Sequence, residues 1–225
     1  MDASELYDPE FRELIKSKKP TIIIPVGSIE QHGAHLPITT DSDIVTEIAS
    51  RLAKKCGFIV FPTVSYGVSN EHDPFFNTSL ESSTLWKIIG DIDKSLLKNK
   101  LKSVIILNGH HGNAISLKLA ERRARYQRPP GMRKIRFYSY WHFMKHEFDH
   151  AGFVETSIMF AISDKVKMKK AKKGLITKGM SEKEIQRINK LSTQPGGFPK
   201  VAKNGVWGDQ LMQQRRTGKN SLLKL

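Results

Sequence analysis

Residues 21–56 read TIIIPVGSIEQHGAHLPITTDSDIVTEIASRLAKKC, and this stretch sets the class of fold. Its first six residues are mostly β-branched and apolar, which is typical of a strand buried on both faces. From residue 42 to residue 55, apolar side chains recur at helical spacing, at Ile44, Ile48 and Leu52. A buried strand, a polar loop and an amphipathic helix in this order predict the first half of a parallel β-α-β unit.

The same alternation continues along the chain. Further buried strands are predicted at residues 58–61, 103–107 and 134–138, and further helices at residues 82–98 and 113–126. We therefore predict an α/β fold, a mainly parallel sheet flanked by helices on both faces. With 225 residues, 39% of them hydrophobic, the whole chain (residues 1–225) is expected to form a single domain.

The composition limits the classes of function. A net charge of +15 raises nucleic acid as a partner, but the basic residues are spread over the helices and the run 165–173 without a nucleic-acid-binding motif. Nucleic-acid binding is thus the disfavoured, non-enzymatic alternative. Residues 1–20 lack the apolar core of a signal peptide, and no later run suits a membrane span, so we expect a cytoplasmic protein. The single cysteine, Cys56, is expected in the core, and it excludes a thiolate-rich metal site.

Polar, glycine-containing clusters follow the predicted strands. GSIEQHGAHLPITTD (residues 27–41) follows the first strand, SYGVSNEHDPFF (65–76) the second, NGHHGN (108–113) the third and YWHF (140–143) the fourth. Ligands of such sheets bind beyond the carboxyl ends of the strands. The four clusters are therefore expected to meet in one polar pocket.

Five residues of these segments are candidate metal ligands. Glu30 and His32 are two apart in extended chain and point the same way. Asp41, at the predicted helix start, suits either a helix cap or a bridge between metals. His110 and Glu155 enter from the third and fourth strand ends. Alone, each has an ordinary explanation as a surface, core or capping residue, but two histidines and three carboxylates together indicate Zn²⁺, Mn²⁺ or Fe²⁺.

Five blocks of the sequence resemble the creatininase family: PVGSIEQHGAHLPITTDSDI (25–44), YGVSNEHDPFFNTSL (66–80), NGHHGN (108–113), HAGFVETSIMF (150–160) and NGVWGD (204–209). The resemblance implies a doubly wound α/β fold with two divalent metal ions per subunit, Zn²⁺ and/or Mn²⁺, or Fe²⁺. It also implies hydrolysis of a non-peptide C–N bond in a small cyclic or linear amide by a metal-bridging water. A homo-oligomer, such as a hexamer, is implied as well.

The resemblance also implies roles for individual residues. Glu30, Asp41 and His110 would hold one metal, while Asp41 would bridge to a second metal held with His32 and a further carboxylate. Creatininase carries that carboxylate two residues after the NGH histidine, where this chain has Gly112. Family members with this glycine use the Glu of the ETS block, here Glu155, either as ligand or as general base.

Catalysis and substrate contact are assigned in the same way. His150 would donate a proton to the leaving nitrogen, as suits an imidazole near neutral pH. Trp141 matches a family tryptophan near the substrate, and it also fits a core aromatic at a strand end. Glu71 and His72 lie in a pocket loop, where they bind substrate or fix the loop. Creatininase has a tryptophan where this chain has His146, so the substrate need not be creatinine.

Alternative functions remain open at this point. The family resemblance also covers a formamide deformylase acting on a pyrimidine intermediate of flavin and deazaflavin synthesis, and a peptidase that trims a redox-cofactor precursor. A noncatalytic binding protein on the same fold is the third possibility.

The C-terminal tail, residues 210–225, departs from the family pattern. If one base is restored after the codon of Asp209, the shifted reading frame can encode Pro, then Thr-Asp-Ala-Thr-Ala-Glu, then Asn or Asp, then Gly-Lys-Lys-Leu. This sequence matches the C-terminal pattern of the family. We therefore hypothesise a frameshift or sequencing error in this tail. A short, divergent, basic C-terminus is the alternative.

Overall fold

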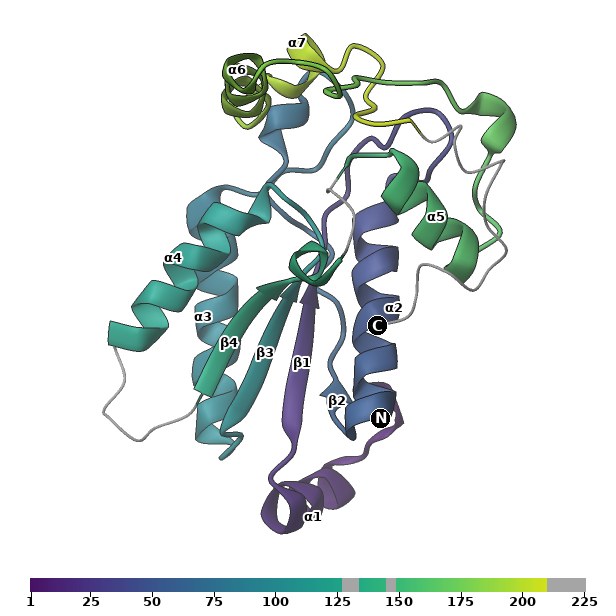
Figure 1. The fold of residues 1–225 in the computed structure, drawn as a ribbon. Helices are drawn as coiled ribbons and strands as arrows, with labels where there is room; N and C mark the ends of the chain where they lie inside the picture. Colours follow the sequence, from purple (N-terminus) through teal and green to yellow (C-terminus); the bar gives the residue numbers. More distant parts are fainter. Residues whose placement is uncertain (127–133, 145–148, 210–225) are drawn as a thin grey trace.

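The computed structural model describes residues 1–126, 134–144 and 149–209 of the chain. A parallel sheet with the strand order β2-β1-β3-β4 forms its centre (Figure 1). The strands are β1 (Thr21–Val26), β2 (Ile59–Val60), β3 (Ser103–Asn108) and β4 (Lys134–Ser139). All four lie within one or two residues of their predicted bounds.

Helices cover both faces of the sheet, as predicted (Figure 1). Helices α2 (Thr40–Cys56) and α5 (Phe153–Ile162) cover one face, and α3 (Ser82–Lys98) and α4 (Asn113–Tyr126) cover the other. Alternate residues of β1 pack into separate cores, Ile23 on the α2–α5 side and Ile22 and Ile24 on the α3–α4 side. Each such buried isoleucine stabilises the fold by about 1.5–3 kcal/mol.

The remaining helices lie at the two ends of the sheet. Helix α1 (Asp8–Lys18) lies below the amino ends of the strands, whereas α6 (Glu182–Ser192) and α7 (Phe198–Val201) lie beyond their carboxyl ends (Figure 1). The Ser181 side chain caps α6, and Glu184 completes a capping box. Short 3-10 turns span Ala3–Glu5, Asn70–His72, Tyr140–Phe143 and Met168–Lys170. None of the helices in the described ranges is long and apolar enough to cross a bilayer.

Three sequence-based expectations need correction or a limit. Cys56 is exposed and not in the core, because it is the last residue of α2. Asp41 is not the helix cap, since α2 begins at Thr40 and Thr39 holds the cap position. His146 and the tail at 210–225 lie outside the described residues.

Candidate metal centre

The loops after β1, β2 and β3 are joined by one buried amide. The Asn113 side chain donates to the carbonyl oxygen of Gly27 at 2.9 Å and accepts from the N–H of Val68 at 2.8 Å. Its position at the start of α4 therefore ties the second loop to the first. The expected convergence of polar loops at the strand ends is present.

The five predicted ligands lie together and are buried. Glu30, His32 and Glu155 have no exposed surface, and Asp41 and His110 are 2% and 4% exposed. Ionisable groups are almost never buried in this way unless they are paired or coordinate a metal. The cluster therefore calls for a compensating charge.

Asp41 lies between two imidazoles. Its Oδ1 is 3.2 Å from Nε2 of His32, and its Oδ2 is 3.0 Å from Nδ1 of His110. A carboxylate with a different imidazole at each oxygen has the arrangement expected of a bridge between two ions. The role predicted for Asp41 is that of such a bridge.

The two halves of the cluster are completed by different carboxylates. Nε2 of His110 lies 3.3 Å from Oε2 of Glu30, whereas Nε2 of His32 lies 3.5 Å from Oε2 of Glu155. Nδ1 of His32 is 3.1 Å from the carbonyl oxygen of Glu30 and can donate to it, which leaves Nε2 free to bind a metal. Glu155 itself is held by the N–H of Ala151 at 2.7 Å.

Several carboxylate oxygens of the cluster lack a hydrogen bond. Among the described residues, Oε1 of Glu30, Oδ2 of Asp41 and Oε1 of Glu155 are buried without a hydrogen-bond partner. Oδ2 of Asp41 nevertheless lies 3.0 Å from an imidazole nitrogen. Two atoms that bind the same ion lie at such a distance from each other, because metal–ligand bonds of about 2.0–2.2 Å place them about 3.0–3.5 Å apart. Their lone pairs then point toward the ion and not toward a hydrogen. The residues present therefore fit a divalent metal centre.

The electrostatics of the cluster also favour a cation. Burial lowers the pKa of His32, but Asp41, Glu155 and Glu30 outweigh it and raise that pKa to about 10. Burial, with Asp41 and Asp149 adding to it against His32, raises the pKa of Glu155 to about 8. The carboxylates thus favour positive charge at His32 and disfavour charge on one another, and divalent ions would stabilise the ionised carboxylates.

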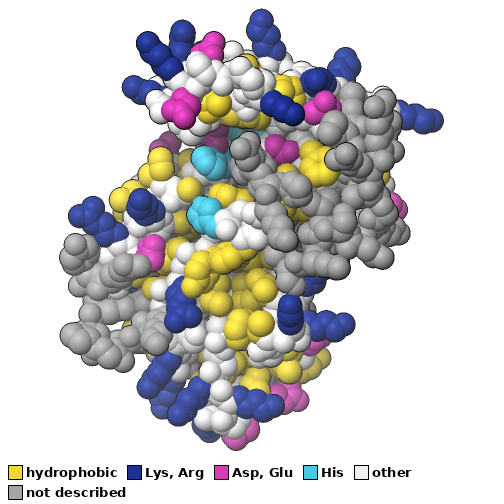
Figure 2. Space-filling view, in the orientation of Figure 1, with side chains coloured by type: hydrophobic (Ala, Val, Ile, Leu, Met, Phe, Trp, Pro, Cys, Tyr) yellow, Lys and Arg dark blue, Asp and Glu magenta, His cyan; other side chains and the backbone are white. Residues whose placement is uncertain are grey.

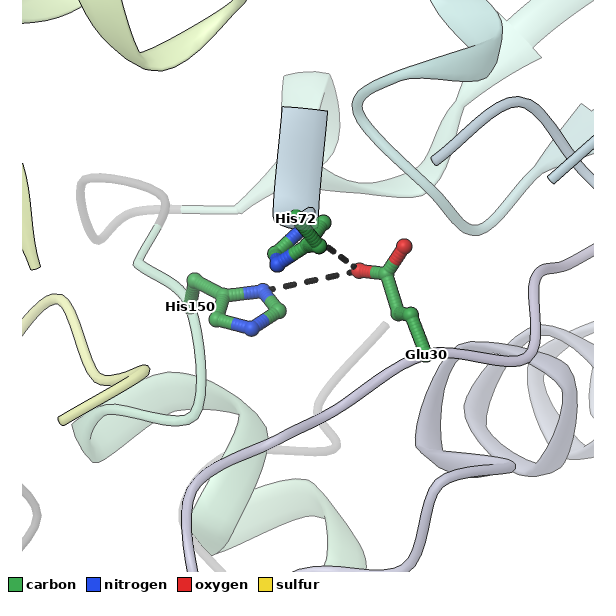
Figure 3. Close-up of side chains that lie close together, drawn as sticks. All are labelled: Glu30, His72 and His150. Atoms are coloured by element: carbon green, nitrogen blue, oxygen red, sulfur yellow. Dashed lines mark ion pairs between the residues drawn. The ribbon is translucent and has the colours of Figure 1, made fainter. Parts of the chain in front are cut away.

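A second pair of imidazoles, His72 and His150, lies beside Glu30 (Figure 3). Oε1 of Glu30 is 3.1 Å from Nε2 of His72 and 3.8 Å from Nδ1 of His150. Burial, followed by the nearby His32 and His72, holds the pKa of His150 well below its usual range. His150 is therefore a neutral imidazole next to the proposed ligands.

Sequence reasoning missed Gln31, which holds both of these imidazoles. Its side-chain nitrogen lies 3.0 Å from Nδ1 of His72 and 3.1 Å from Nε2 of His150. The amide is oriented because its Oε1 accepts from the N–H of Gly33 at 3.0 Å. Nε2 of His150 also lies 3.0 Å from the main-chain oxygen of Gln31, so Nδ1 is the nitrogen directed at Glu30.

A cavity of about 370 Å³ opens above the cluster. Predicted substrate contacts Trp141, Glu71 and His72 line it together with Asp41 and His150. Figure 2 shows histidine and acidic side chains in a hollow below the upper layer of the molecule, whereas lysines and arginines are scattered around the periphery. The cavity thus joins the candidate metal centre to solvent.

The roof of this cavity was not predicted. Asn189, Ser192 and Thr193 of the α6 segment line the cavity, as does Phe198 of α7. The Phe198 ring lies 4.5 Å from that of His72 and 4.8 Å from that of His150. The S-x-x-E signature at Ser181 was the available signal for the helix that supports this roof.

The fold and the side chains define an α/β protein with a candidate dinuclear metal centre at the carboxyl ends of its strands. A family model described as creatininase, creatinine amidohydrolase, matches residues 4–224. The chain therefore belongs to the creatininase family of hydrolases.

Individual relatives have different named activities. Creatinine amidohydrolase of Pseudomonas putida is 28% identical over 184 residues, 70% of each chain. Mycofactocin precursor peptide peptidase of Mycobacterium ulcerans (strain Agy99) is 30% identical over 210 residues, 87% of this chain and 77% of the relative. A 2-amino-5-formylamino-6-ribosylaminopyrimidin-4(3H)-one 5'-monophosphate deformylase of Methanosphaera stadtmanae is 38% identical over 94 residues, 40% of each chain.

Solved creatininases resemble the structure. One described as creatininase Mn has a TM-score of 0.69 at 28% identity and covers 76% of this chain and 77% of its own. A mutant creatininase described as the Zn-Zn type has a TM-score of 0.68 at 27% identity, with 77% of both chains covered. The predicted family and fold are confirmed.

Proposed function

We propose that this chain is a dinuclear metal-dependent amidohydrolase that cleaves a non-peptide C–N bond of a small cyclic or linear amide. The observation that carries the proposal is the set of buried carboxylate oxygens without hydrogen bonds on Glu30, Asp41 and Glu155, three residues that each belong to a buried group able to hold a metal ion. Glu30, Asp41 and His110 would hold one ion, and His32, Asp41 and Glu155 the other. Zn²⁺ and Mn²⁺ suit these donors, and Fe²⁺ is the further candidate.

Bound there, the two ions would supply Lewis acidity toward the amide carbonyl and toward water. The chain supplies the proton transfer. His150 lines the cavity with Nδ1 directed at Glu30, so its imidazole can take up at Nδ1 the proton that the attacking water loses and pass it to the leaving nitrogen. Gln31 fixes the ring for this step, because its main-chain oxygen can accept from Nε2–H of His150 at 3.0 Å.

The cavity walls would bind and enclose the amide. Trp141, Glu71 and His72 stay our candidates for substrate contact, because all three line the cavity. Phe198 covers the His72 and His150 rings and would keep water from the far side of these imidazoles.

The deformylase alternative has less support from the cavity. The deformylase relative is named for a 5'-monophosphate substrate, and phosphate recognition usually employs Arg or Lys. Among the described residues that line the cavity, none is Lys or Arg. An uncharged amide therefore fits better than a phosphorylated one.

A chelator-controlled substrate screen tests the proposal. The protein loaded with Mn²⁺ or Zn²⁺ is expected to hydrolyse at least one member of a panel of cyclic amides, linear amides and formamides, and to lose that activity with a chelator. Bound metal without turnover of any amide would favour the noncatalytic alternative. Turnover of phosphorylated formamides alone would favour the deformylase.

The single domain and the homo-oligomer, such as a hexamer, stay predictions. Ile115 and Leu119 on α4 are 70% and 45% exposed. Phe143, in the turn that follows β4, is also exposed. A subunit contact would cover apolar side chains of this kind. Sedimentation analysis would give the oligomeric state.

A further inference from the structure

Residue 112 has no room for a side chain. A Cβ atom built on Gly112 would lie 2.2 Å from the carbonyl oxygen of Val68, 2.4 Å from Oε1 of Glu71 and 2.5 Å from Nε2 of His110. Real Cβ atoms essentially never approach other atoms this closely. The creatininase pattern with a carboxylate at this position therefore cannot be accommodated without moving the loop after β2.

The space beside Gly112 is filled by a carboxylate from another loop. Glu71 lies in the 3-10 turn Asn70–His72, is 8% exposed and places Oε1 3.4 Å from Nε2 of His110. Glu71 and any side chain at residue 112 are thus mutually exclusive. The loss of a side chain at one position and the arrival of a carboxylate from another are parts of the same arrangement.

The position of Glu71 determines how it can act on His110. Nε2 of His110 lies 2.8 Å from the carbonyl oxygen of Val68, so this nitrogen donates on the side where Glu71 and Oε2 of Glu30 lie. Nδ1, on the opposite side of the ring, is then the nitrogen directed at Asp41. A carboxylate behind a metal-binding imidazole fixes its orientation and raises its basicity.

We infer that Glu71 is a positioning residue for His110, and that its carboxylate strengthens metal binding at Nδ1 of His110, in the Asp41–His110 half of the centre. The inference rests on the proposed function, because it presupposes that His110 binds a metal. It also assigns the two carboxylates to different ions: Glu71 strengthens binding of the ion at His110, and Glu155 binds the ion at His32.

Titration of the metal-free protein with Mn²⁺ tests this division. Glu71→Gln keeps the shape of the side chain and removes its charge. We expect one of the two binding steps to weaken about 10- to 100-fold, the usual effect of losing such a supporting carboxylate, and the other step to stay unchanged. Glu155→Gln should weaken the other step, so the double variant should weaken both.

Two further variants separate charge from folding. Glu71→Asp keeps the charge and is expected to bind Mn²⁺ more tightly than Glu71→Gln, whereas a role in packing alone would favour Gln. Glu81→Gln, on an exposed residue before α3, is the matched control and should titrate like the unmodified protein. Circular dichroism establishes that each variant is folded.

The outcomes distinguish this inference from the proposed function. If the unmodified protein binds two ions and hydrolyses an amide while Glu71→Gln titrates identically, the inference is wrong and the proposed function stands. If Glu71→Gln and Glu155→Gln weaken the same step, the division into halves is wrong. If the unmodified protein binds no Mn²⁺ or Zn²⁺, the proposed function and the inference are both wrong.

Discussion

Two hollows of nearly equal size lie in different parts of the molecule. The cavity at the carboxyl ends of the strands measures about 370 Å³, and a groove between α3 and α4 measures about 340 Å³. In the groove, polar groups pair with each other at the surface: Nζ of Lys94 lies 3.2 Å from Asp91, and the Arg123 guanidinium lies 3.9 Å over the Trp86 ring. These pairs need no ligand.

The cavity differs in the state of its polar groups. Its floor holds carboxylate oxygens that are buried without hydrogen bonds among the described residues, such as Oδ2 of Asp41. Burying such a group costs free energy that a bound metal ion would recover. Asp93 in the groove also has a buried oxygen without a hydrogen bond, but no histidine is among the described residues that line the groove. The comparison teaches that clustered buried carboxylates and imidazoles, and not volume, mark the candidate active site.

The largest effect is expected at Asp41. Asp41→Asn should lose both metal ions and with them the activity, because one carboxylate is proposed to bridge the two halves. Metal analysis per chain measures this, with Asp91→Asn in the groove as the control that should change nothing. A full complement of ions in Asp41→Asn would make the ligand scheme wrong.

A variant of His150 should separate the effect on catalysis from the effect on metal binding. His150→Ala is expected to keep its metal and to lower kcat by roughly 10²- to 10⁴-fold, the usual contribution of a general acid or base. Steady-state kinetics and metal analysis of the same sample check both parts. Loss of metal would instead make His150 a ligand.

A smaller effect is expected from Glu155, which serves only one half of the centre. Glu155→Gln should weaken the affinity for one ion by at least about tenfold. The second ion should stay bound, since Asp41, Glu30 and His110 are unchanged. Competition with a chelator of known affinity measures the two constants. Unchanged metal binding with lost turnover would make Glu155 a general base and not a ligand.

The smallest effect is expected in the groove. Arg123→Ala removes an exposed cation–π contact and should lower the free energy of unfolding by about 0.5–1 kcal/mol. Metal content and turnover should not change, because the groove has no proposed part in the reaction. A large loss of activity in this variant would contradict the distinction between the two hollows.

The sequence predicted the sheet better than the cavity roof. The strand at Thr21–Val26 and the helix at Ser82–Lys98 have patterns that depend on local burial alone, so their bounds were predicted correctly. Phe198 is buried against His72 and His150 because two distant segments meet, and local spacing contains no such information. The same applies to Glu71, whose place depends on the space beside Gly112.

The central claim is that two ions flank Asp41. Crystals of the protein grown with Mn²⁺, measured by anomalous scattering, test this most directly. We predict two peaks per chain, one on the His110 side and one on the His32 side of the Asp41 carboxylate, about 3.5–4 Å apart as in other two-metal sites. No peak at Asp41, or a single peak that Asp41 does not contact, would contradict the claim.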